Sequence, residues 1–169
     1  MRSILRILIS VIAIYGFIAP MNASAEKAPQ FALQGDNKKI QLNNYRGRVV
    51  YVDFWASWCE PCRRSFSWMN KMQSLYGEEK FSIIAINLDE SHDAAKAFLE
   101  KIPASFEIAY DPLGRTAEAY QLKVMPSSFL INRKGELVYR HLGFNNGDKD
   151  ELEKQIKQQL GKGMLAQKQ

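Results

Sequence analysis

The sequence is poor in metal-binding side chains: its 169 residues include only two cysteines and two histidines. A closed zinc site usually takes four ligands from cysteine, histidine or carboxylate groups, and no second cysteine pair exists to complete one. His92 and His141 have no evident partner in the sequence, and we interpret each as a surface or structural histidine. The scarcity of ligands therefore argues against a structural metal centre.

A strong charge of either sign is also absent. The chain carries 23 basic and 18 acidic residues, and the basic ones are scattered rather than gathered in a run interleaved with aromatics. This mild balance argues against nucleic acid as a partner. The sequence shows neither an internal repeat nor a low-complexity segment.

The longest apolar run lies near the N-terminus, over residues 7–19, and is short for a membrane span. It follows Arg2 and Arg6, and the small residues Ala23 and Ala25 form the A-x-A pattern that signal peptidase accepts. We therefore predict that residues 1–25 are a cleaved signal peptide. The alternative is an uncleaved anchor, because the apolar stretch begins as early as residue 4.

The remaining chain has the length of one ordinary domain. We assign this domain to residues 26–161 and a flexible tail to residues 162–169.

Hydrophobic patterning predicts an α/β domain with a mixed sheet and helices on both faces. Two buried strands flank a helix, which implies a right-handed parallel crossover. A short hairpin comes first and another hairpin comes near the end, before a last helix capped by Asp148 and Glu151. The predicted strands are residues 31–33, 40–42, 49–55, 81–88, 106–110, 125–132 and 136–143; the predicted helices are residues 59–76, 91–102, 115–120 and 148–160.

Both cysteines lie in the stretch DFWASWCEPCRRS, residues 53–65, and only two residues separate them. A disulfide across so short a loop contributes only about 2 kcal/mol in the chain-entropy model, and a domain of this size does not need it. A structural staple is therefore a weak interpretation, and a redox couple is favoured.

Pro61 fixes where the helix after this stretch begins, because proline is tolerated only in the first turn of a helix. The helix must start near Cys59, so the Cys59 sulfur lies beside unpaired backbone N–H groups and the positive end of the helix dipole. Both favour a thiolate, which predicts Cys59 as the nucleophile. Cys62 lies one turn deeper on the same side, which predicts it as the resolving thiol.

The segment VDFWASWCEPC, the Met125-Pro126 dipeptide before a strand and the succession of elements resemble the thioredoxin fold. More narrowly, residues 29–160 resemble the TlpA/ResA-like thiol:disulfide oxidoreductases of the bacterial envelope, with an inserted helix and strand at residues 91–110. The resemblance implies a monomeric periplasmic enzyme with a redox-active Cys59–Cys62 disulfide and no further cofactor. Its implied partners are protein thiols and disulfides and a membrane protein that exchanges electrons with it.

The resemblance also implies a substrate-binding surface around the dithiol. In the implied surface, the Met125–Pro126 bond is cis and the backbone at Met125 pairs with an extended substrate segment. Trp58 forms part of an exposed apolar rim, and Glu60 and Pro61 contact the substrate from between the cysteines.

Asp53 lies within a run of β-branched and aromatic residues, so it is either at a solvent-facing strand end or buried, and burial would raise the pKa of its carboxyl group. Thioredoxins carry an aspartate at the matching place, which implies that Asp53 helps to deprotonate Cys62. Many envelope relatives instead have a glutamate three residues after the second cysteine, where this chain has Ser65. We expect the acid that handles protons to be at position 53 here.

The direction of electron flow is not decided by local charge, since Glu60 disfavours a Cys59 thiolate while Arg63 and Arg64 favour it. The resemblance implies reduction of envelope disulfides, often those of apocytochrome c. The residues before Cys59 do not match the P-x-x-x-T-x-x-C loop of peroxiredoxins, which argues against a peroxidase. A non-enzymatic copper-binding or client-binding module remains the alternative.

Overall fold

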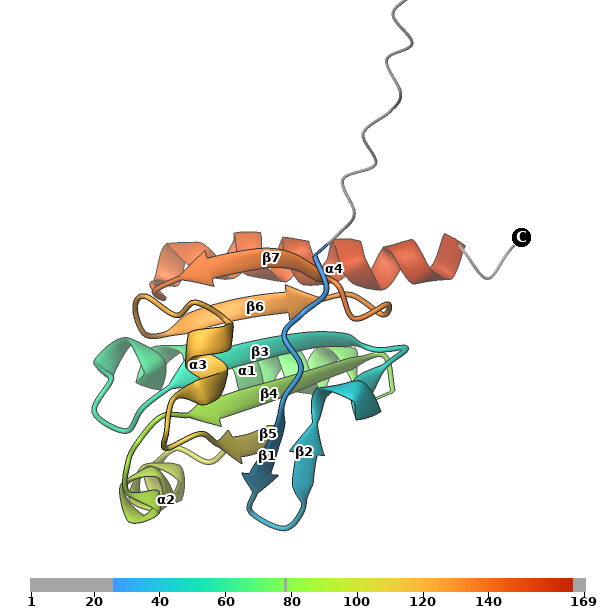
Figure 1. Cartoon of the computed structure of the whole chain (residues 1–169). Coiled ribbons are helices and arrows are strands. Elements are labelled where there is room, and N and C mark those ends of the chain that lie inside the picture. The colour runs from blue at the N-terminus through green and yellow to red at the C-terminus, as the bar shows by residue number, and fades with distance from the viewer. Residues whose placement is uncertain (1–25, 78, 166–169) are drawn as a thin grey trace, which may run out of the picture.

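Residues 26–77 and 79–165 are described by a computed structural model, in which seven strands form one mixed sheet (Figure 1). The strand order is β2-β1-β5-β4-β3-β6-β7. The predicted signal peptide, residues 1–25, lies outside the described residues. Within the described ranges, no helix is both long and apolar enough to cross a membrane.

The three central strands are parallel, and the strands on either side of them are antiparallel to their neighbours. β3 pairs in parallel with β4, and β4 with β5, whereas β6 and β7 continue the sheet as an antiparallel hairpin beside β3. The first hairpin joins the opposite edge through β5. The strands are β1 (Ala32–Gly35), β2 (Lys39–Gln41), β3 (Val49–Trp55), β4 (Phe81–Asn87), β5 (Glu107–Tyr110), β6 (Ser127–Ile131) and β7 (Leu137–Leu142).

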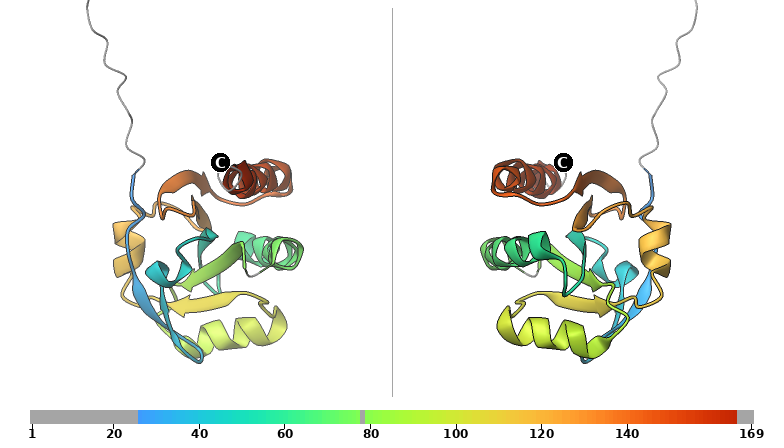
Figure 2. Two further views of the ribbon diagram at one scale, coloured as in Figure 1. Left: turned by 90° about the vertical axis from the view of Figure 1, so that its right-hand side faces the viewer. Right: turned by 90° about the vertical axis from the view of Figure 1, so that its left-hand side faces the viewer.

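Helices cover both faces of the sheet, as the sequence predicts. The two long helices and α2 lie on one side, while α3 and the start of the chain lie on the other (Figure 2). The helices are α1 (Glu60–Tyr76), α2 (His92–Lys101), α3 (Arg115–Ala119) and α4 (Lys149–Leu165), with short 3-10 turns η1 (Leu42–Tyr45) and η2 (Asn146–Asp148).

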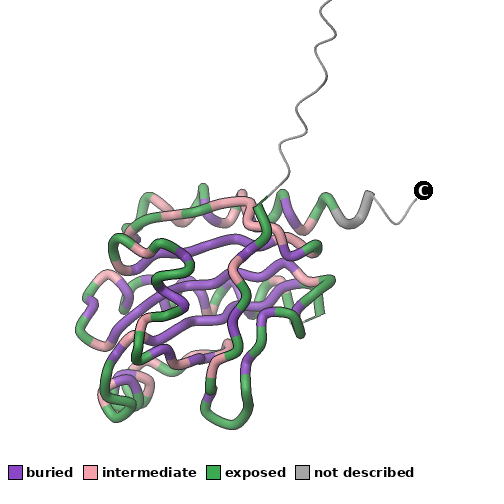
Figure 3. The backbone as a smooth tube through the Cα atoms, in the orientation of Figure 1, coloured by how far each residue is buried: buried purple, intermediate pink, exposed green. Residues whose placement is uncertain are grey.

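Strand alternation divides the core into two apolar layers. All seven residues of β3 are buried, which fits a strand covered on both faces (Figure 3). Tyr51 and Trp55 point to the layer that also holds Cys62 and Phe66 of α1. Val50, Val52 and Phe54 of β3 point to the α3 side of the sheet. Asp53 lies two residues from both Tyr51 and Trp55, so it shares their face and points to the α1 layer.

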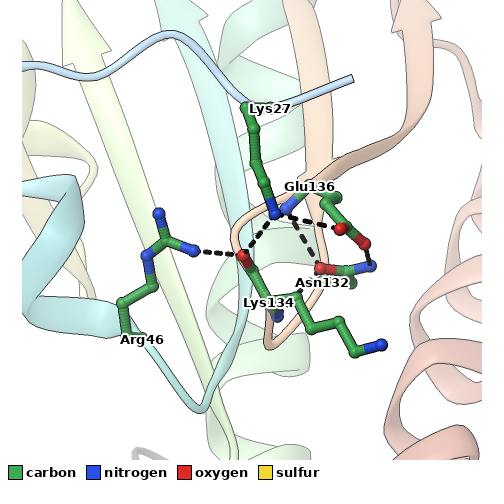
Figure 4. A network of polar contacts seen from close by, with 5 residues as sticks. All are labelled: Lys27, Arg46, Asn132, Lys134 and Glu136. Carbon is green, nitrogen blue, oxygen red and sulfur yellow. Dashed lines mark hydrogen bonds and ion pairs between the residues drawn. The ribbon is translucent and has the colours of Figure 1, made fainter. Parts of the chain in front are cut away.

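The start of the described chain is tied to the turn between β6 and β7 (Figure 4). Lys27 pairs with Glu136 at 3.0 Å, and Asn132 donates a hydrogen bond to the other carboxylate oxygen of Glu136 at 2.9 Å. Arg46 and Lys27 both donate to the carbonyl oxygen of Lys134. This network holds residues 26–28 along the outer side of β7.

Two details of the last helix differ from the sequence prediction. The capping box pairs Asn145 with Asp148, not Asp148 with Glu151, because a 3-10 turn precedes the helix and moves the box three residues earlier. The helix also continues to Leu165 instead of ending near residue 160. Gly161 lowers helix propensity without ending the helix.

Candidate active site

Cys59 and Cys62 form a disulfide at the start of α1, with their Cα atoms 5.3 Å apart. Cys59 is the N-cap residue and has extended backbone angles, while Pro61 lies in the first turn, as predicted. No side chain caps this helix end, so its first N–H groups face the Cys59 sulfur region without a side-chain acceptor. This setting favours a thiolate at Cys59 when the disulfide is reduced.

The two sulfur-bearing residues differ in depth. Cys59 retains 5% of its surface, whereas Cys62 is fully buried in the α1 layer. Cys59 is therefore the less deeply buried of the two. The burial order is the one expected for an attacking and a resolving cysteine.

The loop before Cys59 is held by a buried acid that sequence reasoning missed. The backbone N–H and the hydroxyl of Ser57 donate to the two carboxylate oxygens of Asp89, at 2.9 and 3.1 Å. Asn87 donates a third hydrogen bond to Asp89 at 2.8 Å. Asp89 follows the end of β4, and Leu88 still pairs with Trp55 there, so the loop is anchored to the central sheet.

The dipeptide predicted to face the dithiol lies at the same end of the sheet. The Met125–Pro126 bond is cis, as predicted. Ser127 follows it and pairs with Phe54, near the end of β3, which leads into the loop that carries Cys59. Met125 packs against the cluster that contains both cysteines. The structure therefore brings the two segments together.

Exposed apolar side chains occupy this end of the sheet. Trp58, with 71% of its surface exposed, immediately precedes Cys59. Val124 lies just before the cis bond, and Leu142, opposite Ser127, ends β7; both are exposed. We call Trp58, Val124 and Leu142 the apolar rim. From the sequence we predict only Trp58 as part of this rim. Val124 and Leu142 come close to it only because of how the strands pair, which the sequence does not show.

Asp53 is buried in the middle of β3, with 1% of its surface exposed. Burial raises the pKa of its carboxyl group well above the usual range. Its Oδ2 atom is buried and has no hydrogen-bond partner among the described residues. An acid in this setting is neutral over a wider pH range than usual and can exchange a proton with a buried neighbour.

Ser65 is also buried, but its hydroxyl donates to the backbone carbonyl of Cys62 at 2.9 Å. This bond lies within the first turns of α1 and is a common use of serine inside a helix. Ser65 therefore serves local helix geometry.

The charged residues around the cysteines pair with one another. Glu60, which lies between the cysteines, is exposed, and its carboxylate is 3.5 Å from Arg63 and 3.9 Å from Arg64. The Arg63 guanidinium also lies over the ring of Phe98. Pro61 is half-buried. In residues 26–77 and 79–165, no three His, Cys, Asp or Glu side chains gather where they could hold a metal ion.

Comparison with known families identifies this arrangement. Residues 23–156 match the family model described as Redoxin, which is most of the chain. The chain belongs to the Redoxin family. The match includes the W-C-E-P-C segment, the inserted α2 and β5, and the cis-proline loop.

Individual relatives narrow the assignment. Thiol-disulfide oxidoreductase ResA of Bacillus thuringiensis subsp. konkukian is 32% identical over 133 residues, covering 78% of this chain and 76% of that protein. A putative thiol:disulfide interchange protein DsbE from Chlorobium tepidum is 48% identical in its crystal structure, with a TM-score of 0.79 over 80% of this chain and 96% of that one. A putative protein disulfide isomerase from Bacteroides thetaiotaomicron is 26% identical, with a TM-score of 0.76 over 85% and 93%.

The fold, the cysteine pair and the relatives all support the same assignment. The chain is a thiol-disulfide oxidoreductase of the thioredoxin fold, similar to ResA.

Proposed function

We propose that this protein exchanges disulfides with other proteins in the bacterial periplasm, with Cys59 as nucleophile and Cys62 as resolving thiol. The observation that carries the proposal is the depth order of the pair: Cys59 reaches the surface at an uncapped helix start, and Cys62 is enclosed beneath it. This order of burial supports Cys59 as the residue that meets a partner first.

In the reducing direction, the Cys59 thiolate attacks one sulfur of a substrate disulfide. A mixed disulfide forms and the first substrate thiolate leaves. Cys62 then loses its proton and attacks the Cys59 sulfur, which releases the second substrate thiolate and forms the Cys59–Cys62 disulfide. Two electrons pass from the enzyme to the substrate, and the two substrate thiolates take up protons from solvent.

Asp53 is proposed to accept the proton of Cys62. Its side chain faces the layer that holds Cys62, and burial raises the pKa of its carboxyl group toward that of a thiol. Ser65 is engaged with a backbone carbonyl, which leaves Asp53 as the acid suited to this task.

The apolar rim, with Met125 and Pro126, is proposed to receive the substrate. An extended segment beside the cis-proline loop can pair with the backbone at Met125, while Trp58 packs on its apolar side chains. Glu60 and Pro61 lie between the cysteines and complete the contact surface.

We further propose that the protein acts as a reductant, with apocytochrome c among its substrates, and that a membrane protein supplies its electrons. The predicted signal peptide supports export, and its retention as an anchor would keep the enzyme at the inner membrane. We expect a monomer with no cofactor besides its own disulfide.

A trapping experiment tests the site assignment. The Cys62→Ser variant, expressed in its own host, should accumulate mixed disulfides through Cys59, and mass spectrometry of these adducts would identify substrates and the electron donor. Cys59→Ser is the matched control and should trap none. Equal trapping by both variants would refute the assigned order.

Redox equilibration with glutathione tests the direction. A reductant should have a potential near that of thioredoxin, about −270 mV, whereas an oxidant should approach that of DsbA, about −120 mV. A value near the second would contradict the reducing assignment while leaving the enzyme class intact.

A further inference from the structure

The proposed role of Asp53 raises the question of how its proton reaches solvent. The carboxyl group retains 1% of its surface and lies in the middle of the central strand. A proton accepted there in each turnover must leave before the next one. The inference that follows rests on this proposed role.

A row of polar side chains leads from Asp53 to the edge of the sheet. Asp53 is paired directly with Ser128 of β6, and Ser128 is paired directly with His141 of β7. Directly opposite residues point to the same face, with Cβ atoms about 4.5–5.5 Å apart. The exposed fraction rises along the row, from 1% at Asp53 and 3% at Ser128 to 18% for the His141 side chain.

A β-bulge creates this row. The pairing of β6 with β7 shifts by one residue between Leu130 and Ile131. Without the shift, Arg140 would lie opposite Ser128, and His141 would point to the other face of the sheet. Bulges commonly redirect side chains near active sites. Here the bulge places an imidazole, not a guanidinium, in line with Asp53.

The outer end of the row is fixed at the start of α4. The Nε2 atom of His141 lies 3.2 Å from Oδ2 of Asp148, and the same oxygen accepts the backbone N–H of Asn145 at 2.6 Å. The His141 ring stacks on Tyr139 with an interplanar angle of 11°. Asp148 is itself partly exposed. The Nε2 atom of His141 is buried, and the imidazole lies between Ser128 on the neighbouring strand and the partly exposed Asp148.

The groups packed around Asp53, Ser128 and His141 are the other candidate routes for the proton. Tyr51 lies two residues before Asp53 on β3, and burial raises the pKa of the Tyr51 hydroxyl well above its usual range, so it stays protonated. From the helices, the buried contacts on this face are apolar or aromatic, such as Trp68 and Leu152. Tyr139, His141 and Asp148 are the titratable groups that face the row from β7 and η2.

We propose that Ser128 and His141 relay the proton of Asp53 to solvent beside Asp148. In the step that forms the Cys59–Cys62 disulfide, the Cys62 proton passes to the Asp53 carboxylate. Asp53 then gives its proton to the Ser128 oxygen as the Ser128 hydroxyl gives its own proton to one nitrogen of His141, and the other nitrogen releases a proton to solvent beside Asp148. Each transfer along the row requires a bridging water or a rotation of the side chains into hydrogen-bond distance. Asp53 returns to its ionised form, so the protons balance over each turnover.

The test isolates the resolving step. The reduced protein is mixed with Ellman's reagent, so that Cys59 releases one thionitrobenzoate and Cys62 then releases a second. In dilute buffer, His141→Gln and Ser128→Ala should slow the second release by about tenfold or more, since positioned proton transfer typically contributes 10²–10⁴ in rate. The first release should be unchanged. Added imidazole should restore the rate of His141→Gln, which a loss of structure would not allow.

His92→Gln is the matched control, because His92 is the other histidine and lies on α2 outside the row. It should leave both releases unchanged. If Asp53→Asn slows the second release while His141→Gln and Ser128→Ala do not, the relay is refuted and the role of Asp53 stands. If Asp53→Asn also leaves the second release unchanged, both the relay and the proposed role of Asp53 are refuted. Slowing that imidazole does not reverse would also overturn the relay.

Discussion

Asp89 accepts hydrogen bonds from both the backbone N–H and the hydroxyl of Ser57, two residues before Cys59. The carboxylate is buried, and Asn87 donates to it from the end of β4. The loop that presents Trp58 and Cys59 is therefore attached to the central sheet by side-chain bonds as well as by chain connectivity.

Removal of this acid should destabilise the fold. Asp89→Ala leaves several donors without an acceptor, and each buried unsatisfied group costs about 1–3 kcal/mol, so we expect a loss of about 2–4 kcal/mol. Ser57→Ala removes only the hydroxyl bond and should cost about 1 kcal/mol. Urea unfolding measures both. Equal losses in the two variants would show that the backbone bond to Asp89 contributes little.

The buried acid at position 53 makes stability depend on pH. Because the folded state raises the pKa of Asp53, folding is most favourable below the ordinary carboxyl pKa and loses stability as the pH rises toward the raised value. Each unit of that rise costs about 1.4 kcal/mol. Asp53→Asn should therefore be more stable than the parent protein at pH 8, with the advantage vanishing near pH 4.

Urea denaturation of the oxidised parent and Asp53→Asn proteins between pH 4 and pH 8 measures which of the two is more stable at each pH. Glu100→Gln, at an exposed site on α2, serves as the control and should follow the parent protein at every pH. An Asp53→Asn variant that is less stable at pH 8 would mean that the ionised carboxylate is compensated in the fold.

Trp58 should matter for protein substrates more than for small ones. Trp58→Ala removes the largest exposed apolar side chain beside Cys59, so KM for a protein disulfide should rise about tenfold, equivalent to ~1.4 kcal/mol. The rate with Ellman's reagent should change little, because that probe does not span the rim. Leu113→Ala, an equally exposed apolar site before α3, should alter neither.

The charge between the cysteines should tune the reduction potential. Glu60→Gln removes a negative charge next to Cys59, which favours the thiolate and so makes the disulfide more oxidising. Glu60 is exposed and already pairs with Arg63 and Arg64, so the rise should be small, about 5–20 mV. Arg64→Gln should shift the potential the other way. Glutathione equilibration at low and high salt measures both shifts, which should shrink as salt screens them.

Much of this site follows from local chemistry and is visible in the sequence. The position of Pro61 predicts where α1 starts, and this start distinguishes the N-cap residue Cys59 from Cys62 inside the helix. The run of β-branched and aromatic residues around Asp53 predicts a strand covered on both faces. These inferences depend on neighbours in the chain, so they need no knowledge of the tertiary fold.

The rest of the site depends on pairing across the sheet. Asp89 contacts Ser57 across 32 residues, and nothing in either segment specifies the partner. The row that ends at His141 requires the one-residue shift between β6 and β7, which the turn sequence does not reveal. The sequence therefore suggests only a structural role for His141. The register of β6 with β3 and β7 shows that His141 lies in line with Asp53.

The attachment of residues 26–28 to the outer side of β7 also affects how the molecule behaves in a crowded solution. An edge strand offers unpaired N–H and C=O groups on which a second chain can assemble into a larger sheet. Here the protein's own first described residues occupy the beginning of that edge, and Lys27 holds them there through its ion pair with Glu136. β2, at the opposite edge, is only three residues long. The fold thus limits self-association at both ends of its sheet while leaving the cysteine end open to partners.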